Sequence, residues 1–142
     1  FSTSPSNPAN PGDPTSLANK PTSLGPEIYI IHGEMYTASG QYAKAMDAYS
    51  KALEIESTNA IALTSIARLH QRQNNTDKAV EFYRKAIQSQ PKDANLMAEL
   101  ADVHARAGQL PAAKEQLKKA IEIDGANRSL RSALASILID EG

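Results

Sequence analysis

Histidines are the side chains in this sequence best suited to bind a metal ion or to transfer protons. There are three of them, and two, His70 and His104, lie 34 residues apart. A protein metal site usually needs more ligands than such a pair supplies. We therefore expect the imidazoles of His32, His70 and His104 to pack against neighbouring residues, with His70 and His104 forming local hydrogen bonds. We predict no metal ligands.

Other signatures of catalysis are also missing from the sequence. It contains no glycine-rich phosphate loop, no nucleophile elbow and no His-Glu-x-x-His motif, and with no cysteine it has no thiolate. Asn74-Asn75-Thr76 and Asn127-Arg128-Ser129 match the glycosylation acceptor pattern, but these residue types also cap helices, and we favour capping. We predict a protein that is not an enzyme and binds no cofactor.

The composition argues against two classes of partner. Fifteen basic and 16 acidic residues give a net charge of −1, so no general field attracts nucleic acid. No run approaches the roughly 18 apolar residues of a membrane span, so we expect no direct membrane insertion. A length of 142 residues with 41% hydrophobic content is enough for about one domain.

A 34-residue internal repeat organises the sequence after residue 25. Lys51-Ala52-Leu53, Lys85-Ala86-Ile87 and Lys119-Ala120-Ile121 follow one another at that interval. We align residues 26–59, 60–93 and 94–127, with 128–142 beginning a fourth line. Small residues then share columns, as do large apolar residues that would pack between them. The small columns are Gly33/Ala67/Ala101/Ala135, Ala45/Ala79/Ala113 and Ala52/Ala86/Ala120, and the large ones are Tyr29/Leu63/Met97, Tyr49/Tyr83/Leu117 and Leu53/Ile87/Ile121.

Each unit is predicted to contain two helices, because its apolar residues recur at steps of three and four. The break within a unit falls on the column Gly40/Asn74/Gly108, whose residues readily adopt the left-handed conformation. The break between units falls on Asn59/Asp93/Asn127, a column of helix-capping residues, with Pro91 stopping the preceding helix. Residues 128–142 place Leu130, Leu134, Ile137 and Leu138 on one face, which predicts either a capping helix or the start of a truncated fourth repeat.

This pattern resembles the tetratricopeptide repeat family. The matching residues are Tyr29, His32-Gly33, Tyr36, Ala45, Tyr49 and Ala52 in the first unit, Leu63, Ile66-Ala67, Ala79, Tyr83, Ala86 and Pro91 in the second, and Met97, Leu100-Ala101, Ala113, Leu117 and Ala120 in the third. His32 replaces the usual leucine, and His70 and His104 replace the usual tyrosine. The resemblance implies an all-α domain over residues 26–142, a right-handed helical solenoid of three helix-turn-helix repeats plus a C-terminal capping helix.

The resemblance also implies a protein interaction scaffold, whose concave groove binds a peptide or partner protein through outward-facing residues of each first helix. Glu34, Arg68 and Asp102 alternate in charge along one column, which ordinary solvent-exposed pairing explains. By the resemblance the groove residues are Glu27, Ile30, Glu34, Thr37, Ala38, Ile61, Thr64, Arg68, Gln71, Arg72, Asn95, Ala98, Asp102, Ala105 and Arg106.

One ligand class of this family is disfavoured. Tetratricopeptide domains that bind the C-terminal tails of heat-shock chaperones use a two-carboxylate clamp of lysine, asparagine and arginine side chains. The matching positions here are Ile30, Glu34, Ser65, Asn95 and Glu99, which do not retain that clamp. Forked hydrogen bonds from Arg68, Arg72 and Arg106 remain suited to a single acidic group.

Residues 1–25 differ from the repeats in composition. Five prolines lie among Ser, Asn, Thr and Gly, which predicts an extended linker or tail. Two alternatives to a peptide-binding scaffold therefore stay open: self-association through the tail or the end helix, and an accessory domain of a larger envelope or enzyme complex. Such a spacer resembles those of bacterial envelope proteins, so we favour an envelope or periplasmic fragment of a longer protein, with a cytoplasmic location as the alternative.

Overall fold

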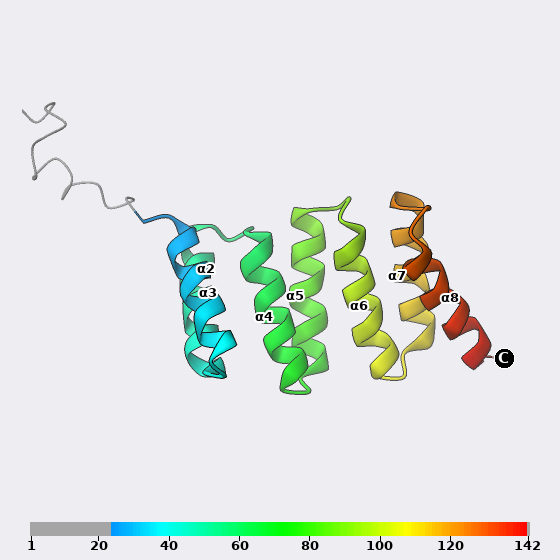
Figure 1. Ribbon diagram of the computed structural model, residues 1–142, viewed down its shortest axis with the longest axis horizontal. Coiled ribbons are helices and arrows are strands. Elements are labelled where there is room, and N and C mark those ends of the chain that lie inside the picture. The colour runs from blue at the N-terminus through cyan, green and yellow to red at the C-terminus, as the bar shows by residue number, and fades with distance from the viewer. Residues whose placement is uncertain (1–23, 142) are drawn as a thin grey trace, which may run out of the picture.

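The computed structural model describes residues 24–141, and over this range the chain is all α-helical. Most of the predicted tail, residues 1–23, lies outside the described residues. The helices stand in a row from one end of the molecule to the other, and each contacts the next along the chain (Figure 1). They are α2 (Pro26–Ala38), α3 (Tyr42–Ile55), α4 (Ala60–Arg72), α5 (Thr76–Ser89), α6 (Ala94–Arg106), α7 (Leu110–Ile123) and α8 (Arg128–Glu141).

This order confirms the predicted fold class, three helix pairs followed by a single helix. None of the helices between residues 24 and 141 is both long enough and apolar enough to cross a membrane.

The turn inside each unit has the predicted left-handed residue. Gly40, Asn74 and Gly108 have φ angles of 77°, 59° and 78°. The residue after each of them donates a backbone hydrogen bond to a carbonyl of the preceding helix; the Gln109 N–H, for example, lies 2.8 Å from the His104 oxygen. This arrangement ends a helix by satisfying its last carbonyl groups. The break within the unit therefore follows from a single residue position.

The start of each following helix has the predicted cap. The Oδ1 atoms of Asn59, Asp93 and Asn127 accept hydrogen bonds from backbone N–H groups at the starts of α4, α6 and α8. Capping is thus confirmed for Asn127. Asn74 instead occupies the left-handed turn, and its neighbour Asn75 caps α5.

Alanine columns let the helices approach closely. Six alanines, two from each of α3, α5 and α7, have no exposed surface; they are Ala45, Ala52, Ala79, Ala86, Ala113 and Ala120. Gly33 of α2 packs so closely that an added Cβ atom would lie 2.5 Å from the Tyr49 ring. Ala135, the α8 member of the Gly33 column, is exposed because within the described residues nothing follows α8.

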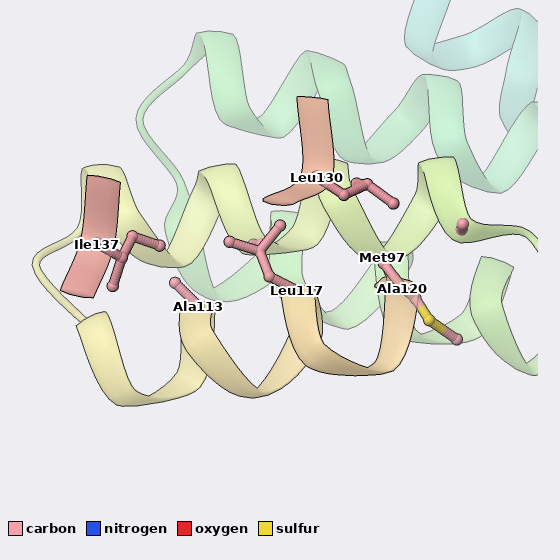
Figure 2. Close-up of a cluster of buried hydrophobic side chains, with 8 residues drawn as sticks. Met97, Ala113, Leu117, Ala120, Leu130 and Ile137 are labelled. Carbon is pink, nitrogen blue, oxygen red and sulfur yellow. The ribbon is translucent and has the colours of Figure 1, made fainter. Parts of the chain in front are cut away.

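The apolar core continues along the row as overlapping clusters, and α8 covers its last part. Leu117 of α7 points between Leu130 and Ile137 of α8 (Figure 2), and all three are buried. Of the other residues predicted for this face, Leu134 is partly buried and Leu138 is 48% exposed. The helix α8 therefore caps the stack with one side and leaves an apolar edge in solvent.

Candidate functional site

Three hollows follow one another along the first helices of the units. The first, about 310 Å³, lies between α2, α4 and α6; the second, about 620 Å³, between α4 and α6; and the third, about 370 Å³, between α6, α7 and α8. Arg68 and Glu99 line both the first and the second hollow, while Ala98 and Asp102 line both the second and the third. Together the hollows form one continuous surface, which we call the inner groove.

All of the predicted groove residues on α4 and α6 line these hollows. Together with Glu34 of α2, they are Ile61, Thr64, Arg68, Gln71, Arg72, Asn95, Ala98, Asp102, Ala105 and Arg106. The other predicted residues of α2, namely Glu27, Ile30, Thr37 and Ala38, are not among the lining residues. The sequence pattern therefore predicts the groove residues well in the second and third units and poorly at α2.

Two of the predicted positions are buried instead of facing outward. Ile30 is 7% exposed and belongs to the apolar cluster that contains Tyr49 and Ile66, while Thr64 lines the first hollow but is only 6% exposed. The prediction that these side chains face outward is wrong, because Ile30 packs into that apolar cluster and Thr64 lies between α2, α4 and α6 at the bottom of the first hollow.

Opposite charges pair across the middle of the inner groove. Arg68 Nε donates to Glu99 Oε2 at 2.8 Å, and the hydroxyl of Tyr83 donates to the same oxygen at 2.9 Å. The hydrogen bond to Glu99 raises the pKa of Arg68 above its ordinary value, and burial raises the pKa of Tyr83. Both groups therefore keep their protons at neutral pH, and the carboxylate is held by its two donors.

The remaining arginines of the inner groove differ in their pairing. Arg106 Nε donates to Asp102 Oδ2 at 2.8 Å. Arg72 lies over the ring of Tyr42, with Cζ 4.6 Å from the ring centroid, and its Nη2 donates to the Tyr42 hydroxyl at 2.6 Å. Among residues 24–141, Arg72 forms no ion pair. It is thus a positive charge oriented by an aromatic ring and free to meet an acidic group.

Neither of the two tyrosines that act on the charged residues of the groove was predicted from the sequence. Tyr42, the first residue of α3, orients Arg72, and Tyr83 of α5 reaches Glu99 of α6. For Tyr83 a signal was present in the sequence, because its column contains tyrosine in the first two units and Leu117 in the third. Tyr42 has no equivalent aromatic residue in the other units, because Thr76 and Leu110 occupy its column.

The histidines are only partly as predicted. His104 is buried, with Nδ1 2.7 Å from Gln109 Oε1, which confirms packing with a local hydrogen bond. His70 stacks on Phe82, but its buried Nδ1 has no hydrogen-bond partner, and burial lowers its pKa. His32 is exposed and makes an edge contact with Tyr29, so its predicted packing is wrong. No group of three or more potential metal ligands occurs within residues 24–141.

Two family models, both described as tetratricopeptide repeat, match residues 26–92 and 72–137. Together they span residues 26–137, the whole row of helices except the end of α8. No curated protein sequence matches the chain.

Three solved structures illustrate the structural similarity. The first tetratricopeptide domain of Spaghetti (RPAP3), bound to the HSP90 peptide SRMEEVD, has a TM-score of 0.73 and 18% identity, with 81% of this chain and 91% of that chain covered. The Yersinia enterocolitica type III secretion chaperone SycD, in complex with a peptide of the translocator YopD, has a TM-score of 0.73 and 16% identity, with 94% and 100% covered. A Thermobaculum terrenum O-GlcNAc transferase has a TM-score of 0.68 and 24% identity, with 80% of this chain but only 22% of the transferase covered.

Proposed function

Because the chain belongs to the tetratricopeptide repeat family, we propose that it is a non-enzymatic scaffold that binds a peptide segment of a partner protein in the inner groove. The observation that carries this proposal is the continuity of the three hollows along α2, α4, α6 and α8. A chain of connected hollows suits an extended ligand better than a compact one. The peptide complexes of the Spaghetti domain and of SycD support it.

The polar groups of the inner groove suit a peptide backbone. Asn95 is exposed and offers an amide that donates and accepts hydrogen bonds. The amide of the partly exposed Gln71 makes only long hydrogen bonds, of 3.4 Å each, to Asp102 and Tyr83. The nearby charges of Arg68 and Glu99, and of Asp102 and Arg106, are already paired. A ligand therefore meets a nearly neutral surface, in which Arg72 is the cation without a carboxylate.

The chemistry of the first hollow argues against chaperone tails as ligands. Glu34 is an exposed carboxylate that lines this hollow, and Glu99 provides a second one, although Arg68 pairs with it. A ligand with two adjacent carboxylates would be repelled by Glu34 and would have to displace Glu99 from Arg68. We propose that the partner peptide carries at most one acidic group near Arg72.

Substitution of Arg72 tests the proposal. Peptides that bind the full chain are first selected from a random displayed library, and their affinities are measured by calorimetry. For peptides with an acidic residue, Arg72→Ala is expected to weaken binding about tenfold, because a hydrogen bond to a charged group contributes about 1.5–3 kcal/mol.

Arg84→Ala is the matched control for that measurement. Arg84 is an exposed arginine of α5 and is not a lining residue of the inner groove, so its removal is expected to leave affinity unchanged. Equal losses for the two variants, or failure to select any peptide, would contradict the proposed function.

Self-association through the end helix is a second candidate function. Leu138 is 48% exposed and Ile139 is 76% exposed, and both lie on α8. Adjacent exposed apolar residues favour burial against another surface. If this candidate is correct, light scattering is expected to show a concentration-dependent oligomer for the full chain and a monomer for the Leu138→Ser/Ile139→Ser variant. A monomer at all concentrations for both proteins would rule it out.

The similarity to an O-GlcNAc transferase bears on the third alternative. That enzyme contains a similar stack of helices as a minor part of its length. Membership of a larger complex is compatible with the proposed function, since the inner groove would then serve as the binding part of that assembly.

A further inference from the structure

The third hollow of the inner groove differs from the corresponding places in the first two units. In the first two units the corresponding column holds Tyr49 and Tyr83, which are both buried, and Tyr83 lines the second hollow. The hydroxyl of Tyr83 donates to Glu99 at 2.9 Å, and that of Tyr49 lies 3.5 Å from Thr37 Oγ1. In the third unit the same column holds Leu117, which is shorter and has no hydroxyl, and which lines the third hollow of about 370 Å³.

The surroundings of Leu117 lack the hydrogen-bond partners that surround Tyr83. The residues that correspond to Gln71 and Glu99, the partners of the Tyr83 hydroxyl, are Ala105 and Ala133, each 34 residues further on. Both line the third hollow together with Leu110, Leu130 and Ile137, and the side chains of the last two flank Leu117 in Figure 2. The third hollow is therefore lined mainly by apolar residues, with Ser129 and Ser136 as its uncharged polar ones, whereas polar and charged residues predominate around the second.

The rim of the third hollow carries negative charge. Asp140, in the last turn of α8, is exposed and forms no ion pair among residues 24–141. It lines the hollow with Asp102, which pairs with Arg106, and its neighbour Glu141 pairs with Lys114 at 2.9 Å. The carbonyl end of a helix also favours cations. A basic group is therefore the suitable neighbour for an apolar side chain that enters this hollow.

We propose that the third hollow is a specificity pocket that takes one large apolar side chain, phenylalanine or leucine, of a bound peptide, with a lysine or arginine beside it facing Asp140. The inference rests on the proposed function, because it states which residues of a bound peptide the same inner groove selects. The negative charge of the rim and the apolar lining of the hollow both favour this occupant over a second acidic segment.

Closing the third hollow from its rim tests the inference without altering the core. Ala133 is exposed on α8 and lines the hollow, whereas Ala135 is exposed on the same helix and is not a lining residue. Ala133→Leu is expected to lower the affinity for selected peptides about tenfold or more, and Ala135→Leu is expected to leave that affinity unchanged. Leu117→Tyr changes a buried residue and restores the residue type of the first two units, and it is expected to reproduce the loss.

The selected peptides provide a second readout. Peptides selected on the full wild-type chain are expected to share a phenylalanine or leucine next to a lysine or arginine. Replacing that apolar residue by serine is expected to weaken binding to the wild type but not binding to the Ala133→Leu variant. Peptides without a large apolar residue, or equal affinity for Ala133→Leu and wild type, would overturn the inference while leaving the proposed function intact. A change of oligomeric state in Ala133→Leu would identify a second copy as the occupant and would also overturn it.

A small probe separates this pocket from the peptide function. N-acetylphenylalanine methylamide is expected to shift the methyl resonances of Ala105 and Ala133 in the wild type. If no peptide is selected but these shifts occur, the proposed function fails and the pocket stands. If no peptide is selected and no shifts occur, both the proposed function and the pocket are wrong.

Discussion

Replacing Tyr83 by alanine is expected to lower the free energy of unfolding by about 3–5 kcal/mol, the range found when a large buried aromatic side chain is removed. Tyr83 is 1% exposed and packs in the middle of the row in a cluster with Ala67, Leu100 and Val103. The loss is expected to spread beyond the site, because part of the stability of each unit in a repeat array comes from its contacts with the neighbouring units. Urea denaturation followed by circular dichroism measures the effect.

Tyr83→Phe is the matched control for this prediction. It keeps the ring and removes only the hydroxyl that donates to Glu99 at 2.9 Å, so a loss of about 1 kcal/mol is expected. Similar losses for the two variants would show that the hydrogen bond, and not the packing of the ring, is what Tyr83 contributes.

Replacing Gly33 by valine is expected to destabilise the first unit by about 1–3 kcal/mol, the usual cost of overpacking. A Cβ atom at this position would lie 2.5 to 2.7 Å from three carbon atoms of the Tyr49 ring, so α2 and α3 would have to move apart. Valine is chosen because the second unit carries Ala67 beside Tyr83, which shows that alanine can be accommodated in this column. Thermal unfolding of the variant and the wild type measures the loss.

The same substitution in a Tyr49→Leu background identifies the cause. The third unit pairs Ala101 with Leu117, a smaller residue than tyrosine, so Gly33→Val is expected to cost less when Tyr49 is leucine. An equal cost in both backgrounds would indicate that the conformational freedom of glycine, not contact with the ring, explains Gly33.

The fold was predictable from the sequence because its determinants are local and repeated. The turn at Gly40 and Gly108 depends on one left-handed residue, and the start of α4 depends on the side chain of Asn59. The turn occurs at the same place in all three units, and the cap occurs at the start of each helix that follows a unit. An error of interpretation in one unit would therefore have been visible in the others.

The errors concern residues whose surroundings differ between units. From the alignment of the repeats, His32 was predicted to pack against its neighbours and Ala135 to lie where two helices approach closely. Both side chains are exposed. They lie on α2 and α8, the first and last helices of the described row, where a neighbour is missing on one side. A repeat pattern gives the average environment of a column and does not give the difference between an inner and an end position.

The candidate site was less predictable than the fold because pairing across helices depends on side-chain length and direction. The sequence suggested that three arginines could receive an acidic group. In the structure Arg68 and Arg106 are paired with Glu99 and Asp102, and only Arg72 has no carboxylate partner within residues 24–141. The alternating charges along one column indicated that pairing occurs, but they did not identify the partners.

Nuclear magnetic resonance of the labelled full chain, titrated with a selected peptide, tests most directly whether a partner peptide binds in the inner groove. Shifts are expected to concentrate on the lining residues of α4, α6 and α8, including Gln71, Ala98 and Ala133. Shifts concentrated instead on the exposed residues of α5 and α7, such as Lys85 and Lys119, would contradict the account.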